Sequence, residues 1–287
     1  GLNYIDVYHR TGLYPVPEFP VTLGLEAAGV IEACGDNVKD LKPGDRIAYG
    51  TGPFGAYASH RTIEAAKVIK LPNVISDDIA AAIMLKGMTA EYLIHRAYPV
   101  KKGDVVLFHA ISGGVGTLAC QWLKHLGATV IGTAGSADKA DKAKAYGCDH
   151  VIRYDTDDTV KAVMDITDGQ GVPVVYDSVG QSTFEASLNC LAPRGTMVSF
   201  GQSSGAIQSF DPAVLAQKGS LYYTRPSLMD YTKTREDLET SAGKVFSAIE
   251  HGAIDVHIGQ HFDLADVGKA HKALENRKTT GATILRP

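Results

Sequence analysis

The 287-residue chain has only four cysteines and one tryptophan, and it contains no long apolar run. The four cysteines form no Cys-x-x-Cys pair, so the sequence predicts no disulfide framework and no zinc ribbon. We therefore expect free thiols in a reducing compartment, the cytoplasm. Apolar runs such as Ile79–Leu85 are much too short to cross a bilayer, and no membrane association is expected.

The chain also lacks an excess of either charge: 28 Lys and Arg residues stand against 32 Asp and Glu residues, a net charge of −4. A mildly acidic chain with no basic stripe is a poor ligand for phosphate backbones, so nucleic acid is not an expected partner. The fractions of apolar (45%) and charged (21%) residues are ordinary for a globular protein and argue against disorder or a coiled coil. The length predicts about two domains.

The first third of the chain is rich in glycine, proline and short apolar runs, which indicates a small β-rich barrel or sandwich. Strands are predicted at Ala27–Ala33, Arg46–Tyr49, Ala56–Ser59 and Lys67–Leu71, before a helix through Ala80–Leu85. The opening segment from Gly1 to Val7 has the pattern of a strand and its turn. We expect that a preceding strand or hairpin is missing and that the C-terminal segment returns to complete this part.

The middle of the chain alternates short apolar strands with amphipathic helices, the pattern of parallel βαβ units covered on both faces. Strands are predicted at Val105–His109, Thr129–Thr133, His150–Tyr154, Val172–Asp177, Thr196–Phe200 and Leu221–Thr224, and helices at Thr117–Leu126, Ala137–Tyr146, Thr159–Ile166 and Ser182–Cys190. Six such strands predict a doubly wound parallel sheet of the Rossmann type, and therefore the α/β class.

A glycine-rich segment from Ala110 to Gly116 directly follows the first of these strands and opens the next helix. This context is the one that a dinucleotide fingerprint requires. Gly113 would let the backbone approach a diphosphate, and Gly116 would let the helix pack closely on the sheet. The first N–H groups of the helix, at Gly114 and Val115, would then bind the anion.

The residues after the second strand favour NADPH over NADH. An NAD site usually has an acidic residue about 20 residues after the glycine turn. Here that position is Thr133, which we expect to contact the cofactor, and no acid follows it in the next three residues. Ser136 could donate a hydrogen bond to the 2′-phosphate, Lys139 could supply charge, and Tyr154 at the end of the third strand could reach the same group.

Several motifs together resemble a known family, the zinc-independent (ζ-crystallin-like) quinone oxidoreductases of the medium-chain dehydrogenase/reductase superfamily. The resemblance covers nearly the whole chain and rests on Gly1–Asp6, Arg10–Pro15, Gly24–Gly29, Gly44–Arg46, Lys86–Thr89, His109–Gly116, Tyr176–Gly180, Arg225–Ser227 and Glu275–Gly281. It implies a GroES-like catalytic domain, residues 1–86 and 226–287, interrupted by a Rossmann domain, residues 87–225.

The same comparison separates this chain from the zinc-using relatives. Their catalytic zinc is held by the histidine of a Gly-His-Glu motif, where this chain has Leu25 between Gly24 and Glu26. No cysteine precedes Cys34, and no set of three or four ligands is apparent. We therefore expect no metal, and an acceptor that takes electrons readily without a Lewis acid, such as a quinone.

The resemblance further implies which residues surround the reacting groups. Asn3, Tyr8, Tyr14 and Thr89 would line the active cleft as catalytic residues, and Asn3 and Thr89 would also contact the cofactor. Further cofactor contacts would come from Ser178, Val179, Phe200, Gly201, Ser203, Ser204 and Arg277. The last sheet strand, Ser220–Thr224, would pair with its copy in a homodimer.

Two other functions remain open. An NADPH-dependent reductase of α,β-unsaturated ketones or acyl thioesters needs the same unassisted hydride acceptor site. A protein that holds NADPH while binding RNA or serving a structural role is a second alternative, which the acidic net charge disfavours.

Overall fold

A computed structural model describes residues 1–287 and divides the chain into two compact units. Unit 1 consists of Gly1–Thr89 and Leu228–Pro287, and unit 2 of Ala90–Ser227. The C-terminal segment thus belongs with the N-terminal β-rich part, as the sequence led us to expect. The sequence predicts domain boundaries after residues 86 and 225, and the structure divides the chain after residues 89 and 227.

Unit 2 contains one six-stranded sheet in which every neighbouring pair is parallel, with the order β6-β5-β4-β7-β8-β9. The strands are β4 (Val105–Phe108), β5 (Thr129–Ala134), β6 (His150–Arg153), β7 (Val172–Asp177), β8 (Leu191–Ser199) and β9 (Tyr222–Thr224). Numbered within the sheet, this is the 3-2-1-4-5-6 order of a dinucleotide-binding fold, whose direction of winding reverses between β4 and β7. The predicted doubly wound sheet is therefore confirmed.

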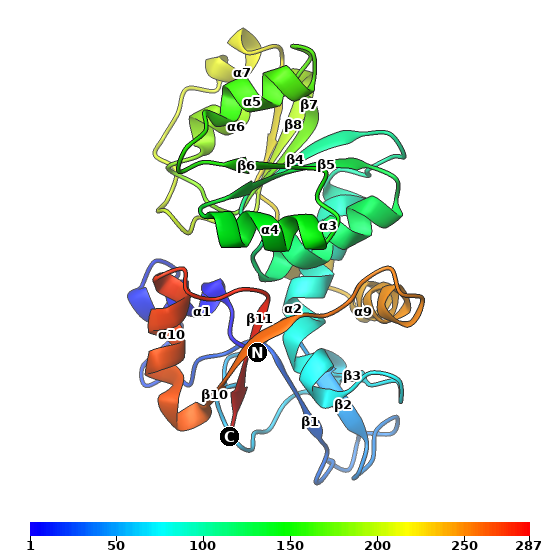
Figure 1. Ribbon diagram of the computed structural model, residues 1–287. Helices are drawn as coiled ribbons and strands as arrows, with labels where there is room; N and C mark the ends of the chain where they lie inside the picture. The colour runs from blue at the N-terminus through cyan, green and yellow to red at the C-terminus, as the bar shows by residue number, and fades with distance from the viewer. The chain divides into compact units, whose positions relative to one another are not determined.

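Helices cover both faces of this sheet, with α3 and α4 on one face and α5 and α6 on the other (Figure 1). The helices of unit 2 are α3 (Gly114–His125), α4 (Ala137–Ala145), α5 (Thr159–Ile166), α6 (Phe184–Asn189) and α7 (Ala213–Gln217). The apolar side of the strands is packed against the second pair of helices, with Leu107, Ile131, Val175 and Met197 at most 3% exposed. β8 is longer than predicted and begins at Leu191, with irregular pairing to β7 near Val172.

Unit 1 has two small sheets. One is antiparallel, with β1 (Ala27–Val30), β2 (Arg46–Tyr49) and β3 (Ile69–Lys70) in that order. The other is a parallel pair, β10 (Ile258–Asp263) with β11 (Ala282–Arg286). Leu2 donates its N–H to the carbonyl of Thr283 at 3.0 Å, which joins the start of the chain to its last strand.

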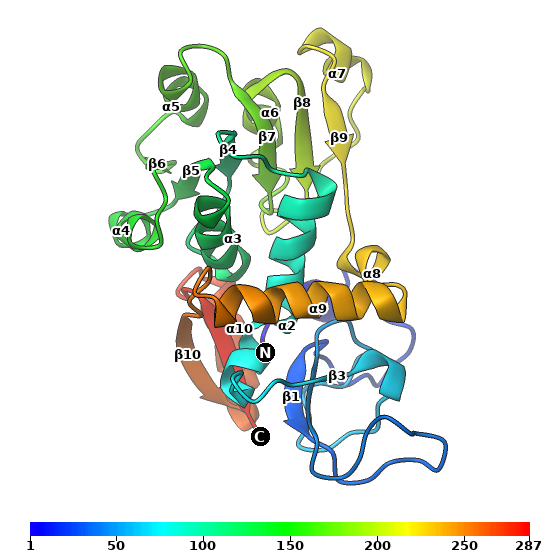
Figure 2. The ribbon, with the colours of Figure 1, turned by 90° about the vertical axis from the view of Figure 1, so that its right-hand side faces the viewer.

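The helices of unit 1 lie in both of its chain segments, and α1 contacts α10, as Figure 1 shows. They are α1 (Tyr4–Thr11), α8 (Leu228–Tyr231), α9 (Arg235–Glu250), α10 (Val267–Glu275) and the 3₁₀ turns η1 (Ala65–Lys67) and η3 (Leu264–Asp266). α2 (Asp77–Tyr92) begins in unit 1, ends in unit 2 and continues into a π-helical turn η2 (Leu93–Ala97) (Figure 2). No helix combines the length and apolar content that crossing a membrane requires.

The expected strand at the start of the chain is wrong, because Tyr4–Thr11 forms helix α1. The reason is local: the N–H of Asn3, just before the helix, donates to the carboxylate of Asp6 at 2.9 Å. This reciprocal use of the N-cap residue and the third helical residue is a helix start signal, the capping box. The β-branched residues around it outweighed that signal in the sequence analysis.

Two further predictions differ from the structure. Ala56–Ser59 is an irregular bend, not a strand, and Ala56 and Tyr57 donate their N–H groups back to Gly24 and Leu23. The helix predicted to end at Leu85 continues through Gly87. A Cβ at Gly87 would come within 2.7 Å of Val245 on α9, so this glycine allows two helices to approach and does not end one.

Candidate active site

The glycine-rich segment forms the corner where β4 passes into α3. Ala110 has φ 54°, a left-handed conformation, and its carbonyl accepts the N–H of Gly113 at 2.9 Å. The first hydrogen bond of the helix runs from Thr117 N–H to Gly113 O at 2.9 Å. The N–H groups of Gly114, Val115 and Gly116 precede it and have no partner within the helix. Such a helix start suits an anion, as the dinucleotide motif predicts.

The corner leaves no room for a side chain at Gly116 and little room at Gly113. A Cβ at Gly116 would lie 2.5 Å from the carbonyl oxygen of Ile111 and 2.7 Å from that of Ala110. A Cβ at Gly113 would lie 3.2 Å from the carbonyl oxygen of Ala110. This bare backbone cradle fits a group that must be approached by N–H groups, such as the diphosphate of a dinucleotide.

The residues predicted to select NADPH lie at the neighbouring strand ends. Ser136 caps α4, and its hydroxyl oxygen accepts the N–H of Lys139 at 3.4 Å. Tyr154 follows β6, and its hydroxyl lies against Gly135, where a Cβ would come within 2.2 Å of it. The structure therefore brings Ser136, Lys139 and Tyr154 together at the N-terminus of a helix, where the macrodipole favours negative charge. Asp138 lies in the same first turn of α4.

Thr133 ends up inside the unit, with 1% of its surface exposed. Its hydroxyl contacts Nδ1 of His109 at 3.1 Å and accepts the N–H of Ala110 at 3.2 Å. Its predicted contact with a cofactor stays a prediction, and the hydroxyl is already used to hold the glycine-rich segment.

The loops after β7 and β8 are joined by hydrogen bonds. Ser203 donates its N–H to Ser178 O at 3.2 Å, and Ser204 donates to Val179 O at 2.8 Å. A Cβ at Gly201 would lie 2.5 Å from the carbonyl oxygen of Ser178, so only glycine fits there. Phe200, which belongs to the same predicted set, packs against Phe108 at the end of β4, with the two ring centroids 5.6 Å apart. The structure thus gathers these predicted cofactor residues at the carboxyl edge of the sheet.

Tyr8 and Tyr14 come together in unit 1, with ring centroids 5.0 Å apart. The N–H of Tyr14 donates to the carbonyl of Tyr8 at 3.1 Å, which brings the chain back after α1. Tyr8 is buried and Tyr14 is partly exposed. His9 contacts the ring of Tyr14 at 5.7 Å and that of Phe54 at 4.6 Å, so the two tyrosines belong to an aromatic cluster.

Asn3 and Thr89 are both connected to a buried ion pair that the sequence analysis missed. Glu26 Oε2 accepts hydrogen bonds from Asn3 Nδ2 at 2.7 Å and from Lys86 Nζ at 3.0 Å. Glu26 Oε1 accepts the N–H of Leu85 at 2.7 Å, and the hydroxyl of Thr89 donates to the carbonyl of Leu85 at 2.7 Å. The side chain of Glu26 is fully buried. An acid and a lysine within apolar surroundings were the available sequence signal.

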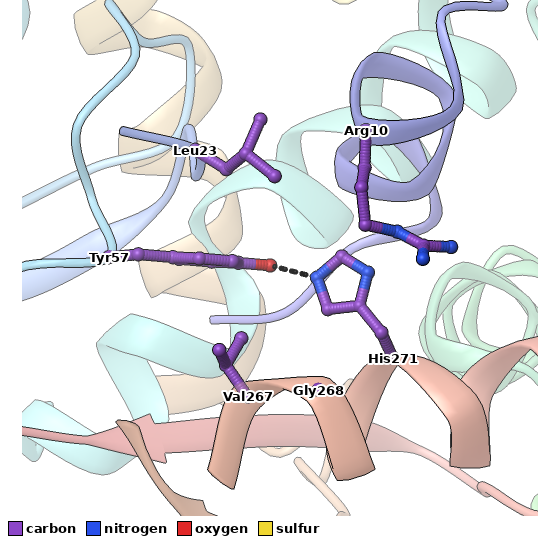
Figure 3. Close-up of a pocket in the computed structure, with 6 residues that line it drawn as sticks. All are labelled: Arg10, Leu23, Tyr57, Val267, Gly268 and His271. Atoms are coloured by element: carbon purple, nitrogen blue, oxygen red, sulfur yellow. Dashed lines mark hydrogen bonds between the residues drawn. The ribbon is translucent and has the colours of Figure 1, made fainter. Parts of the chain in front are cut away.

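A second buried polar group lies beside it. The hydroxyl of Tyr57 donates to Asp6 Oδ2 at 2.9 Å and lies 3.0 Å from Nε2 of His271 (Figure 3). Burial raises the pKa of Asp6 to about 6, against hydrogen bonds from Asn3 and Tyr57 that lower it. Burial also lowers the pKa of His271. Tyr57 and His271 line a pocket of about 260 Å³ with Arg10, Leu23, Val267 and Gly268.

Arg277 lies in unit 1, directly after α10, in a left-handed conformation with φ 58°. Its N–H donates to the carbonyl of Leu274 at 3.0 Å. The predicted contact of its side chain with a cofactor stays a prediction. The predicted catalytic residues Asn3, Tyr8, Tyr14 and Thr89 also belong to unit 1, and the remaining predicted cofactor residues belong to unit 2.

The residues present do not fit a catalytic zinc ion. Leu25 offers no donor atom and is only 5% exposed, and the neighbouring Glu26 is paired with Lys86. No group of three or more His, Cys, Asp or Glu side chains in residues 1–287 is placed to hold a metal ion. Zinc requires such a set, so no catalytic step is assigned to it.

Comparison with known proteins agrees with this arrangement. Residues 1–97 match the family described as alcohol dehydrogenase GroES-like domain, and residues 114–240 match the family described as zinc-binding dehydrogenase. The chain therefore combines a GroES-like N-terminal part with a Rossmann-type sheet, the fold of the medium-chain dehydrogenases and reductases.

Individual relatives narrow the assignment to one family within this superfamily. The chain is 48% identical over 287 residues to a quinone oxidoreductase of Pseudomonas aeruginosa, covering 100% of this chain and 88% of the relative. It is 42% identical to a 2-haloacrylate reductase of a Burkholderia species, covering 100% and 88%. The crystal structure of the Escherichia coli quinone oxidoreductase complexed with NADPH matches with a TM-score of 0.98 and 49% identity, covering 100% and 89%. The chain belongs to the quinone oxidoreductase family of this superfamily.

Proposed function

We propose that this protein is an NADPH-dependent quinone oxidoreductase that works without a metal ion. The observation that carries the proposal is the bare backbone corner at Gly113–Gly116, because Cβ atoms at Gly113 and Gly116 would lie within 3.2 Å of backbone oxygens. Quinone oxidoreductases that match this chain over its whole length, one of them solved in complex with NADPH, support the proposal.

Different residues of unit 2 would bind different parts of the cofactor. The N–H groups that open α3, at Gly114, Val115 and Gly116, would bind the diphosphate. Ser136, Lys139 and Tyr154 would bind the 2′-phosphate, because a serine hydroxyl, an ammonium group and a phenol are all donors to an anion. Ala110, Thr133, Ser178, Val179, Phe200, Gly201, Ser203 and Ser204 would line the rest of the site.

When bound, NADPH supplies a hydride to the substrate. The protein's own contribution is to orient the substrate and exclude water. Tyr8 and Tyr14 offer two aromatic rings and two hydroxyl groups, which suit a planar acceptor with oxygen atoms. Asn3 is held by its hydrogen bond to Glu26, and the hydroxyl of Thr89 is held by the carbonyl of Leu85, so these positions do not depend on the substrate. Arg277 would also contact the cofactor.

A second activity has specific support. One relative, at 42% identity, is named 2-haloacrylate reductase, and a haloacrylate contains a carbon–carbon double bond conjugated to a carboxylate. Reduction of an α,β-unsaturated carbonyl compound is therefore the alternative reaction, and it would use the same site.

We further propose that β9 pairs with its copy in a homodimer. β9 is the last strand in the sheet order, with one neighbour, β8, and Tyr222 on it is 63% exposed. A sheet edge that exposes unpaired backbone groups and an aromatic ring is commonly covered by a partner strand. The four free thiols favour a reducing compartment, the cytoplasm.

Steady-state oxidation of NADPH and NADH, measured with a panel of quinones and a panel of enones and haloacrylates, tests the proposal. We expect turnover of quinones with NADPH at a lower KM than with NADH. Turnover of the alkenes alone would move the assignment to the alternative reaction. No turnover with any acceptor, together with no change in melting temperature on addition of NADPH, would reject both.

A further inference from the structure

A continuous line of buried polar side chains crosses the carboxyl ends of three neighbouring strands of unit 2, β5, β4 and β7. It consists of Thr133 on β5, His109 directly after β4, Ser187 on α6 and Asp177 at the end of β7. All four residues are at most 2% exposed. His109 Nδ1 lies 3.1 Å from Thr133 Oγ1, His109 Nε2 lies 3.0 Å from Ser187 Oγ, and Ser187 Oγ lies 2.7 Å from Asp177 Oδ2.

The hydrogen atoms in this line have one consistent arrangement. A carboxylate only accepts, so the hydroxyl of Ser187 donates to Asp177 and its oxygen accepts from Nε2–H of His109. Nδ1 of His109 then carries no hydrogen and accepts from the hydroxyl of Thr133. The oxygen of Thr133 in turn accepts the N–H of Ala110 at 3.2 Å. Burial lowers the pKa of His109, which keeps the imidazole in this neutral form.

Each end of the line holds a segment of the candidate cofactor site. At one end is Ala110, the first residue of the glycine-rich corner, in its left-handed conformation. At the other end, Asp177 Oδ1 accepts the N–H groups of Val179 at 2.7 Å and Gly180 at 3.0 Å, which shapes the loop after β7. Asp177 Oδ2 also accepts the hydroxyl of Thr183 at 2.7 Å. Among side chains, the imidazole of His109 joins the two halves of this line, beside the backbone bond from His109 N–H to the carbonyl of Tyr176 at 3.0 Å.

We propose that His109 is a positioning residue that couples the diphosphate corner to the loop after β7, so that both have their binding shape before the dinucleotide arrives. The inference rests on the proposed function. His109 does not take part in chemistry itself, because it is buried and both ring nitrogens are engaged. Its contribution is preorganisation, which lowers the free-energy cost of ordering the site on binding.

The proposal predicts a specific pattern of losses. The diphosphate is common to NADPH and NADH, so disruption of the line weakens both by the same factor. In metal sites, loss of a residue that orients the direct ligands typically costs about 10–100-fold in affinity, and we expect a loss of the same order here. The ratio of the two dissociation constants stays at the wild-type value, and kcat at saturating NADPH changes much less than KM.

Titration calorimetry with NADPH and NADH on the full chain tests this in three variants. His109→Leu removes both hydrogen bonds, and we expect the loss just stated. His109→Gln keeps one donor and one acceptor at similar spacing, and we expect most of the affinity to return. Thr133→Val removes one hydroxyl from the line, and combined with His109→Leu it should add little, because both changes break the same link.

Thr167→Val is the matched control. The hydroxyl of Thr167 donates to Val163 O at 2.8 Å and accepts the N–H of Gly171 at 3.0 Å, at the opposite edge of the sheet. It should lower the melting temperature without changing either dissociation constant. If His109→Leu does not fold, Ser187→Ala carries the test, because Ser187 is not among the residues proposed to contact the cofactor.

Two results separate the inference from the proposed function. Wild-type binding of NADPH together with unchanged dissociation constants in the folded line variants would overturn the inference alone, leaving His109 as a core residue. A wild-type chain that binds neither nucleotide would overturn the proposed function and the inference with it.

Discussion

Replacement of Gly116 by alanine tests the packing that defines the cofactor corner. The added Cβ would lie 2.5 Å from Ile111 O, 2.7 Å from Ala110 O and 2.7 Å from the carbonyl carbon of Ile111. All three are backbone atoms, which cannot rotate away as a side chain can. The glycine-rich segment must therefore move, and overpacking of this kind typically costs about 1–3 kcal/mol.

Alanine also favours a helix over glycine by about 1 kcal/mol, so the two effects oppose each other at Gly116. We expect the steric term to win, with a net loss of about 1–2 kcal/mol of unfolding free energy. Because the shifted atoms adjoin the diphosphate N–H groups, the dissociation constant for NADPH should rise at least about tenfold, which corresponds to 1.4 kcal/mol.

Gly243→Ala in α9 is the matched control, because a Cβ there meets nothing within 4 Å and the residue is exposed. It should raise the unfolding free energy by up to about 1 kcal/mol and leave NADPH binding unchanged. Urea unfolding and fluorescence titration measure both quantities. A Gly116→Ala variant that is as stable as Gly243→Ala and binds NADPH with wild-type affinity would refute the reasoning.

Three further changes test other parts of the molecule. Lys139→Ala should weaken the binding of NADPH about tenfold or more and that of NADH much less, since only NADPH carries the 2′-phosphate. Replacement of the exposed Lys142 by alanine should alter neither dissociation constant. Equal losses for both nucleotides would exclude Lys139 as the phosphate ligand. In the folded protein the pKa of Asp6 is about 6, against a usual pKa of 3.8. The unfolding free energy of the wild type should therefore fall by about 3 kcal/mol relative to Asp6→Asn as the pH rises from 4 to 6, and stay level above pH 6. Parallel pH profiles of urea unfolding for the two proteins would contradict this. Lys86→Met leaves the buried carboxylate of Glu26 without its cation and should cost about 3–5 kcal/mol of unfolding free energy. Lys70→Met, which breaks the pair of an exposed lysine with Asp45, should cost about 1 kcal/mol or less. Equal costs in thermal unfolding would show that the buried pair has no special weight.

Local signals in the sequence located the six strands and helices α3–α6 of unit 2, but not α7 or the start of β8. Each strand there is a short apolar run next to a turn, and each helix begins or ends at a residue with a clear local role, such as Ser136 as the N-cap of α4. Unit 1 was harder. The capping residues Asn3 and Asp6 stand within a β-branched and aromatic segment, so periodicity pointed to a strand where the chain forms a helix.

The polar groups inside the molecule show a different limit. Glu26 and Lys86 are 60 residues apart, His109 and Ser187 are 78 apart, and Tyr57 and His271 are 214 apart. No pattern within one segment connects such partners. The sequence identified Leu25 as unfit for a metal, but it did not show that the adjacent Glu26 holds Asn3 and Lys86.

By itself, then, the order of residues determined the parallel sheet, the glycine-rich corner and the residue types available to a nucleotide, since these depend on spacing along the chain. Only the folded chain decided which hydroxyls are already engaged, as at Thr133, and which charges are paired away from water, as at Glu26. Hydrogen bonds and burial depend on distances through space, and those exist only once distant segments have packed together.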